Sequence, residues 1–295
     1  MRRFTGIYFK LSLFALIGCS PVQSGVLTGG LEDYRLVKGP IVLADIPNNA
    51  SGICWMDALS QYLVVQNNAG IIYRYDQDFN YLGKIAKEGN IHNDMEGLAC
   101  LPGSRLLVAT EISQVHKFNI DANTQKINGN FDVSQAYIVK PMPLVSNKGL
   151  EGIAIRRSDN EQPIRVYVGE EGGSASTKSK MSIRYFDLPK DNLSRNAPKH
   201  FEKDLDVHVS FDAEKQFRGY ITDLAGMTID PTTGHLIIVS QESHKAIEVN
   251  AETGEVLSEL MLDPKMEYEG VTFGPDNELV FVIERHWLEV YKRKK

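Results

Sequence analysis

The 295-residue chain has only three cysteines, and the signatures of several common enzyme classes are missing from it. It contains no His-Glu-x-x-His, no paired Cys-x-x-Cys and no cluster of histidines, so a zinc site is disfavoured. Gly-x-Ser-x-Gly, P-loop and dinucleotide-binding motifs are also absent, which disfavours α/β-hydrolases, P-loop NTPases and Rossmann enzymes. The formal net charge is −6 and no basic patch stands out, so we expect no nucleic-acid partner.

The first 19 residues have the composition of an export signal. Arg2, Arg3 and Lys10 give a positive start, and Leu11–Ile17 is an apolar run too short to span a bilayer. The run passes into Leu-Ile-Gly-Cys, which resembles the bacterial lipobox and ends at Cys19. That resemblance implies cleavage before Cys19 and acylation of the new N-terminal residue. The alternative is a plain signal peptide with an incidental cysteine.

This leader defines the expected domains and location. We predict a lipoprotein signal peptide at 1–18, lipidated Cys19 and a flexible tether at 19–32, and a folded domain at 33–295. Ser20 follows the cysteine where an Asp would favour inner-membrane retention, so we expect an outer-membrane protein facing the periplasm. Its contact with the membrane is expected through the lipid anchor alone. Removal of the leader takes away three positive charges and leaves an acidic mature domain.

A unit that opens with a small or acidic residue, a glycine and an apolar residue recurs five times. The glycines are Gly52, Gly97, Gly152, Gly226 and Gly270. Each opening begins a short apolar run, and turns separate it from two or three further strand-like runs. Four antiparallel strands in about 45 residues are typical of a β-propeller blade. We therefore predict an all-β propeller of five four-stranded blades.

Two details of the ring are less regular. The spacing of 74 residues from Gly152 to Gly226 leaves room for a sixth blade, which is the alternative. We assign this segment to one blade, with polar insertions at 172–180 and 189–198 and a fourth strand near 200–202. The last repeat ends after its third strand, so we expect the segment from Gly39 to Ile46 to supply the fourth and close the ring.

Two cysteines remain after the leader, Cys54 and Cys100, each just after a repeat glycine. An oxidising compartment would allow a disulfide. Both lie in apolar first strands, where small buried hydrophobic residues are expected, so we favour two buried thiols over a bridge.

The segments DMEGLA…LLVATE, GLEGIA…RVYVGEE, DLAGMTIDPTTGHLIIVSQES and YEGVTF…LVFVIER resemble the SdiA-regulated family of bacterial envelope propellers, over roughly residues 35–292. The resemblance implies a propeller, an envelope location and a metal site, but no particular chemistry. The chain departs from the acidic pattern at Ser51, Asn68 and Ala225.

Acidic residues recur at two places in the repeats. In a blade, the start of the first strand and the end of the second lie at the same face, so these carboxylates should surround one mouth of the channel. Asp94, Asp223 and Glu267 lie in loops that enter this face. The predicted metal ligands are Glu96, Glu151 and Glu269 at the strand starts, then Glu111, Glu170, Glu242 and Glu284 at the strand ends, with Asp223.

So many carboxylates require protonation or a cation, and calcium accepts six to eight oxygen ligands in irregular geometry. We therefore expect calcium, and a small-molecule or protein ligand, at the acidic mouth. Salt bridges on a solvated rim are the alternative explanation of the acids. A second functional hypothesis is a calcium-dependent hydrolase, similar to propeller phytases or lactonases, with a spare glutamate of the ring, His244 or His286 as the base.

Overall fold

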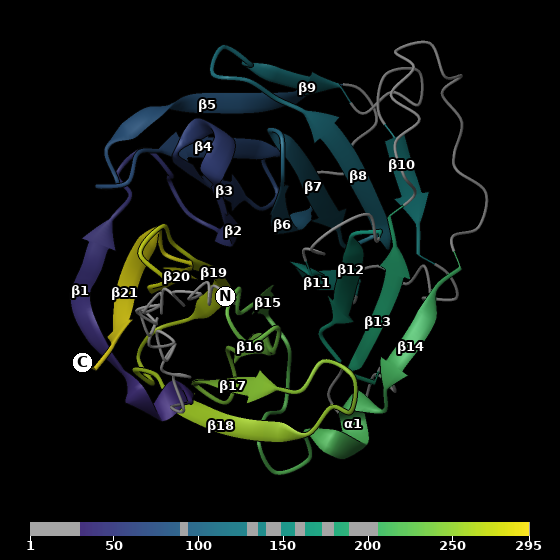
Figure 1. Cartoon of the computed structure of the whole chain (residues 1–295). Coiled ribbons are helices and arrows are strands. Elements are labelled where there is room, and N and C mark those ends of the chain that lie inside the picture. The colour runs from purple at the N-terminus through teal and green to yellow at the C-terminus, as the bar shows by residue number, and fades with distance from the viewer. Residues whose placement is uncertain are drawn as a thin grey trace, which may run out of the picture.

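The chain forms a ring of five β-sheets around a central channel (Figure 1). In the computed structural model, the described residues are 30–88, 94–128, 135–139, 149–156, 163–172, 180–188 and 206–294. The predicted signal peptide, Cys19 and most of the tether lie outside this part of the chain, as do most of the insertions at 172–180 and 189–198. Within the described residues, no helix has the length and apolar character that crossing a membrane requires.

Each sheet is one blade, with its first strand at the channel and its last strand at the periphery. Blade 1 contains β2 (Ala50–Met56), β3 (Gln61–Gln66), β4 (Ile71–Tyr75) and β5 (Tyr81–Glu88), and β9 (Lys126–Asn128) adds a parallel fifth strand. Blade 2 contains β6 (Met95–Leu101), β7 (Arg105–Thr110), β8 (Gln114–Asn119) and β10 (Gln135–Ile138).

The other three blades have four strands each. Blade 3 contains β11 (Leu150–Arg156), β12 (Arg165–Glu170), β13 (Ser182–Asp187) and β14 (His208–Phe211). Blade 4 contains β15 (Gly226–Ile229), β16 (Leu236–Ser240), β17 (Lys245–Val249) and β18 (Val256–Met261). Blade 5 contains β19 (Tyr268–Phe273), β20 (Leu279–Ile283), β21 (Trp287–Arg293) and β1 (Tyr34–Val42). The short helices are η1 (Leu31–Asp33), η2 (Asp57–Leu59) and α1 (Ala213–Gln216).

The predicted five blades are therefore confirmed, and the long spacing after Gly152 belongs to one blade. Its fourth strand is β14, whereas the predicted strand at 200–202 lies outside the described residues. The ring is closed from the N-terminal side, as predicted: β1 pairs antiparallel with β21, from Tyr34 opposite Arg293 to Val42 opposite Trp287. The closing strand ends at Val42, four residues before the predicted end at Ile46.

The hydrophobic core is divided into five layers, one between each pair of neighbouring blades. Successive residues of a strand point to opposite sides of the sheet, so each inner strand contributes to two layers. In β7, Leu106 and Val108 face blade 1, while Leu107 and Ala109 face blade 3. This arrangement explains why the inner strands are continuous apolar runs instead of alternating ones.

The two remaining cysteines form a disulfide, Cys54–Cys100, so the prediction of two free thiols is wrong. Cys54 is the second residue after its repeat glycine and Cys100 is the third, which directs them to opposite sides of their strands. Because the strands belong to adjacent blades, the side chains meet in the layer between blades 1 and 2. The two Cα atoms are 5.7 Å apart, which is within disulfide range.

Candidate functional site

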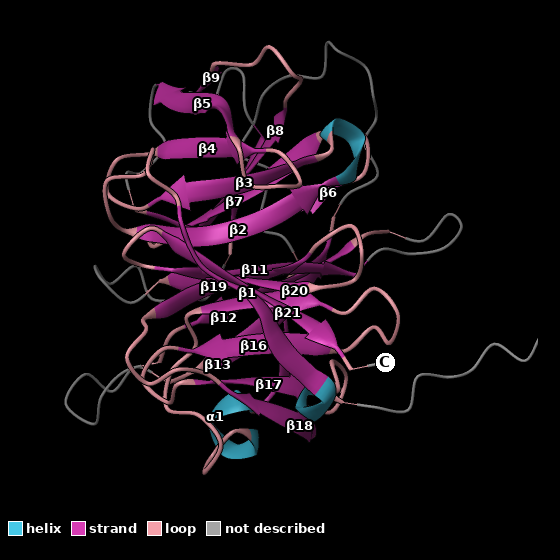
Figure 2. Cartoon of the chain, turned by 90° about the vertical axis from the view of Figure 1, so that its left-hand side faces the viewer, coloured by secondary structure: helices cyan, strands magenta, loops and turns pink. Residues whose placement is uncertain are grey.

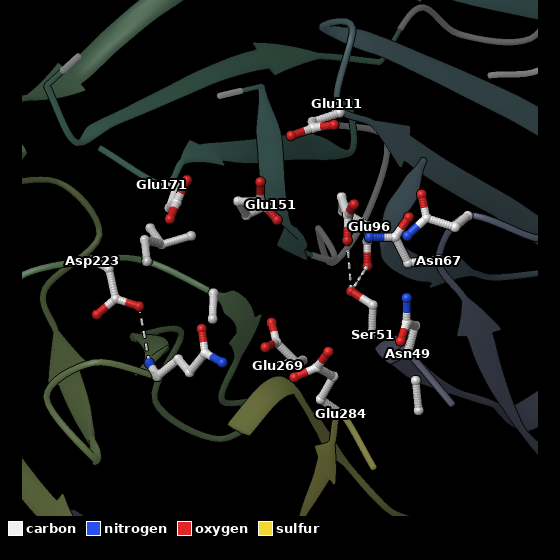
Figure 3. A pocket seen from close by; sticks show the side chains of 15 residues that line it. Asn49, Ser51, Asn67, Glu96, Glu111, Glu151, Glu171, Asp223, Glu269 and Glu284 are labelled. Atoms are coloured by element: carbon white, nitrogen blue, oxygen red, sulfur yellow. Dashed lines mark hydrogen bonds between the residues drawn. The ribbon is translucent and has the colours of Figure 1, made fainter. Parts of the chain in front are cut away.

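One mouth of the channel contains a cavity of about 250 Å³ (Figure 3). It lies where the first strands begin and the second strands end, so every blade contributes to its wall. Six of the eight predicted metal ligands line it. They are Glu96, Glu111, Glu151, Asp223, Glu269 and Glu284.

An inner tier of side chains comes from the residue before each repeat glycine. Its five members are Ser51, Glu96, Glu151, Ala225 and Glu269. Glu96 is only 5% exposed, and Ser51 Oγ donates a hydrogen bond of 2.9 Å to its Oε2. Three carboxylates and one hydroxyl thus surround the channel axis.

An outer tier comes from the residue just after each second strand. Thr110 pairs with Met95, which places the next residue, Glu111, above the inner tier. The same register in the other blades selects the remaining members of this tier. The full set is Asn67, Glu111, Glu171, Gln241 and Glu284.

Glu170 and Glu242 do not line the cavity, and each misses the outer tier by one residue. Glu170 is the last residue of β12 and accepts a 2.5 Å hydrogen bond from Ser182. Glu242 follows Gln241 and accepts a hydrogen bond from Thr222. Because a shift of one residue reverses the side of a strand that a side chain faces, Glu171 and Gln241 occupy the cavity instead. A comparison of paired positions across the five repeats, in place of a search for Glu, would have identified them.

Asp223 organises the entrance of blade 4. Its carboxylate accepts hydrogen bonds from the hydroxyl of Ser240 and from the backbone N–H groups of Gln241 and Glu242. The equivalent residue of blade 1 is Asn49, which also lines the cavity and was missed from the sequence. Burial raises the pKa of Asp223 even though these three donors act in the opposite direction.

The inner glutamates are held in a state that favours protonation. Burial raises the pKa of Glu96 to about 8, and the nearby carboxylates of Glu111, Asp94 and Glu171 act in the same direction, against the Ser51 hydrogen bond. Burial also raises the pKa of Glu151 and Glu269 well above the ordinary value, with further increases from Glu96 beside each. At neutral pH these groups therefore require either a proton or a compensating cation.

The acidity is unevenly distributed around the mouth. Blades 2, 3 and 5 supply a glutamate to both tiers, whereas blade 1 supplies Ser51 and Asn67 and blade 4 supplies Ala225 and Gln241. In blade 1, Asn67 Oδ1 is buried and has no hydrogen-bond partner. The cavity thus combines an acidic arc with neutral hydroxyl and amide groups.

A constriction closes the cavity below the inner tier. The five repeat glycines line it, and the enclosed space is about 10 Å³, roughly enough for one water. A Cβ atom at Gly52 would lie 2.3 Å from the carbonyl oxygen of Glu96, and one at Gly226 would lie 2.6 Å from that of Glu269. Glycine is therefore required at these positions because the inner strand packs directly on the backbone of its neighbour, whereas a Cβ atom at Gly152 would meet the side chains of Met227 and Leu224.

Below the constriction a second cavity of about 460 Å³ opens at the other mouth. Its wall is formed by the later residues of the same inner strands and the turns that follow them. Trp55, Ile155, Ile229 and Phe273 give it an apolar part, and Asp57, Arg156, Asp230 and Asn277 give it a polar one. The two cavities differ in chemistry although they share one channel.

Neither histidine considered as a general base lines the acidic cavity. His286 Nδ1 lies 3.2 Å from the carbonyl oxygen of Pro47, outside the cavity wall. His244 follows β16 in a left-handed backbone conformation and also lies outside it.

The donor set of the cavity fits a hard divalent cation, because carboxylate, amide and hydroxyl oxygens are the ligands that such ions prefer. In the part of the chain that the structure describes, no three Asp, Glu, His or Cys side chains are close enough together to form a complete metal cluster. Ion binding would therefore have to draw the carboxylates inward.

The fold and the cavity define a class: a five-bladed β-propeller with a carboxylate-rich mouth. The family model named SdiA-regulated matches residues 28–286, most of the chain, and the protein belongs to this family. Among curated proteins, no sequence matches the chain.

Solved structures share the fold at low sequence identity. A glucose dehydrogenase is 11% identical with a TM-score of 0.56, over 88% of this chain and 100% of that one. The glutaminyl cyclase of Myxococcus xanthus is 12% identical with a TM-score of 0.52, over 88% of this chain and 95% of that one. The calcium-binding protein regucalcin of Agrobacterium tumefaciens is 11% identical over 86% of this chain and 94% of its own, but its TM-score of 0.48 is too low to bear on function. These likenesses concern the fold alone.

Proposed function

We propose that this protein is a cation-binding propeller of the cell envelope, which binds calcium at the acidic mouth and a ligand or protein partner there. The observation that carries the proposal is the crowding of Glu96, Glu151 and Glu269, three buried carboxylates with raised pKa values. No Lys, Arg or His is among the described residues that line their cavity. A divalent cation would supply the missing positive charge.

Calcium is the cation that the cavity suits best. It accepts irregular sets of six to eight oxygens, and the wall offers carboxylates in three blades with amides and a hydroxyl in blade 1. Glu96, Glu151 and Glu269 would hold the ion, with Glu111, Glu171 or Glu284 as further ligands and Asn67 Oδ1 as a neutral one. A bound calcium would act there as a Lewis acid and as an attachment point for an oxygen of the ligand.

A binding function is favoured over the hydrolase alternative. Calcium-dependent hydrolysis of a phosphoester or lactone requires a base beside the ion, and the two candidate histidines lie outside the cavity. The glutamates that could act as bases are the same groups that would have to hold the cation. We therefore assign no reaction to the site.

The location proposed is the periplasmic face of the outer membrane, with the chain anchored through acylated Cys19. The disulfide Cys54–Cys100 supports a compartment outside the cytosol, because stable disulfides form in oxidising environments. Labelling with a radioactive fatty acid tests the anchor: label is expected on the native chain and not on Cys19→Ala. Absence of label from both would exclude acylation.

The cation is tested by melting curves in EGTA and in excess calcium. An ion that binds only the folded ring at a hundredfold excess over Kd stabilises it by about 2.7 kcal/mol, so Tm should rise by several degrees. Glu151→Gln keeps the size of the side chain but removes one charge, so most of this rise should be lost.

Glu242→Gln is the matched control, because Glu242 lies next to the cavity in sequence but does not line it. It should respond to calcium as the wild type does. An unchanged wild-type Tm, together with no ion in the cavity of a calcium-soaked crystal, would exclude the site.

A further inference from the structure

The outer edge of blade 5 carries an unusual surface. In β1, the side chains of Leu36, Val37 and Val42 are 46%, 48% and 58% exposed. Figure 2 shows β1 on the face of the ring turned toward the viewer, where it crosses the side of the molecule. Its partner β21 covers one edge of the strand, and three large aliphatic side chains remain in solvent on an outermost strand.

The same edge is basic, although the protein as a whole is acidic. Arg35 pairs in register with Lys292, so two cations lie directly opposite each other on neighbouring strands. Like charges in this position destabilise a sheet. Lys38 and Lys294 are exposed nearby, and we call Arg35, Leu36, Val37, Lys38, Val42 and Lys292 the β1 face.

Few carboxylates compensate these charges. β1 contains no acidic residue, and Glu289, the one acid of β21, is 3% exposed and accepts hydrogen bonds from Tyr268 and Tyr291. Lys292 Nζ lies 3.4 Å from Asp276, and Arg35 has no ion pair with any described residue. Lys38 Nζ lies 5.2 Å from the centre of the Phe79 ring, and its charge adds to the effect of hydrogen bonding in lowering the pKa of Asp76. The β1 face itself therefore carries three cations and no acid beside apolar side chains, and Arg35 is the cation without a charge partner among the described residues.

From these observations we propose that the β1 face docks on a bilayer surface that contains anionic phospholipid. Basic side chains beside exposed aliphatic ones match a surface of phosphate headgroups above acyl chains. The position of the face in the chain favours this occupant. Cys19 precedes Gly30 by 11 residues, which span at most about 40 Å, so an acylated Cys19 would keep β1 close to the bilayer.

The docking does not depend on the cation site, and it can be measured without the lipid anchor. The mature chain with Cys19→Ser is mixed with vesicles of phosphatidylcholine and phosphatidylglycerol, and binding is measured by sedimentation. We expect binding to these vesicles, weakening with added salt because the attraction is screened, and little binding to pure phosphatidylcholine.

Two charge-reversal variants locate the contact. Arg35→Glu with Lys38→Glu should lower the vesicle partition coefficient by roughly tenfold or more. Lys215→Glu with Arg218→Glu makes the same change in net charge at a different place, in and just after α1, beside blade 3. Tyr220 is exposed there, and this variant should keep most of the binding. Equal losses in the two variants would mean that only net charge matters, and would overturn the proposal.

Tryptophan fluorescence gives a second measurement. Trp287 pairs in register with Val42, whereas Trp55 lies in the lower cavity of the channel. In a Trp55→Phe chain, vesicles that contain brominated phosphatidylglycerol should quench Trp287. No quenching would overturn the proposal. A second contrary result would be a protein that does not bind vesicles but forms a dimer in solution, which Arg35→Glu with Lys38→Glu dissociates. A second copy of the chain would then be the occupant of the β1 face.

Discussion

At one mouth of the channel the inner strands begin, and six glutamates with one aspartate line a cavity of about 250 Å³. At the other mouth the same strands end, and Trp55, Ile155, Ile229 and Phe273 line a cavity of about 460 Å³. Only a few residues of an inner strand separate the two cavities. In blade 3, Glu151 lines the first cavity and Ile155 lines the second. The glycine after each inner-tier residue narrows the channel between them and separates the carboxylate-rich cavity from one whose charged residues, Asp57, Asp230 and Arg156, are of both signs.

The largest effect on the ring should come from adding a side chain at the constriction between the two cavities. Gly52→Ala places a Cβ 2.3 Å from the carbonyl oxygen of Glu96, and backbone atoms cannot move aside without opening the ring. The free energy of unfolding should fall by about 3 kcal/mol or more, as measured by urea denaturation. Gly103→Asn is the control, because Gly103 has a positive φ that Asn tolerates and nothing lies within 4 Å of the added atom. Similar stability of the two variants would refute the packing argument.

The lower half of the channel is cross-linked, and the upper half is not. Replacement of Cys54 and Cys100 by alanine should lower the free energy of unfolding by about 2–4 kcal/mol, because the bridge restricts a long loop of the unfolded chain. Reduction of the wild type should reproduce most of this loss. The calcium-dependent rise in Tm should persist in the double variant, since the acidic cavity keeps its ligands; its disappearance would show that the two ends are coupled.

The acidic mouth should make the calcium-free protein less stable as pH rises. The pKa of Glu96 is near 4.5 in the unfolded chain and about 8 in the folded one, so the folded state binds more protons between these values. Stability is then greatest below about pH 4.5 for this group and is lost as pH rises toward 8. Glu96→Gln should remove the contribution of this group to the pH dependence, which is on the order of a few kcal/mol.

Glu242→Gln should keep most of the pH dependence of the wild type, because Glu242 lies outside the cavity, although its charge adds to the effect of burial in raising the pKa of Asp223. Calcium should reverse the trend, since an ion binds the ionised carboxylates and competes with protons. A calcium-free stability that is flat from pH 5 to 8 would contradict the raised pKa values.

The repeat was sufficient to predict the ring, because the five glycines mark positions where each inner strand packs on its neighbour. The N-terminal closing strand followed from the missing strand of the last repeat. The outer tier was only partly predictable: turns differ in length between repeats, and at Glu170–Glu171 two identical residues stand side by side. Only the strand register decides which of them faces the cavity.

The disulfide was missed for a related physical reason. Each cysteine was considered within its own repeat, where a small apolar residue is sufficient. Whether Cys54 and Cys100 meet depends on the packing of two blades, which brings residues with different positions in the repeat face to face. Contacts within a blade are encoded by the repeat, whereas contacts between blades depend on the geometry of the ring.

The pairing of β1 with β21 has a consequence for the order of events during synthesis. Tyr34 is among the first described residues to leave the ribosome, and its partner Arg293 is among the last. Blade 5 therefore cannot be completed until Arg293 has been made, and its closure joins segments from opposite ends of the described chain. A chain that is threaded through a translocation pore must be unfolded. For the export proposed above, late closure of blade 5 would therefore delay the finished ring until the chain had crossed the membrane.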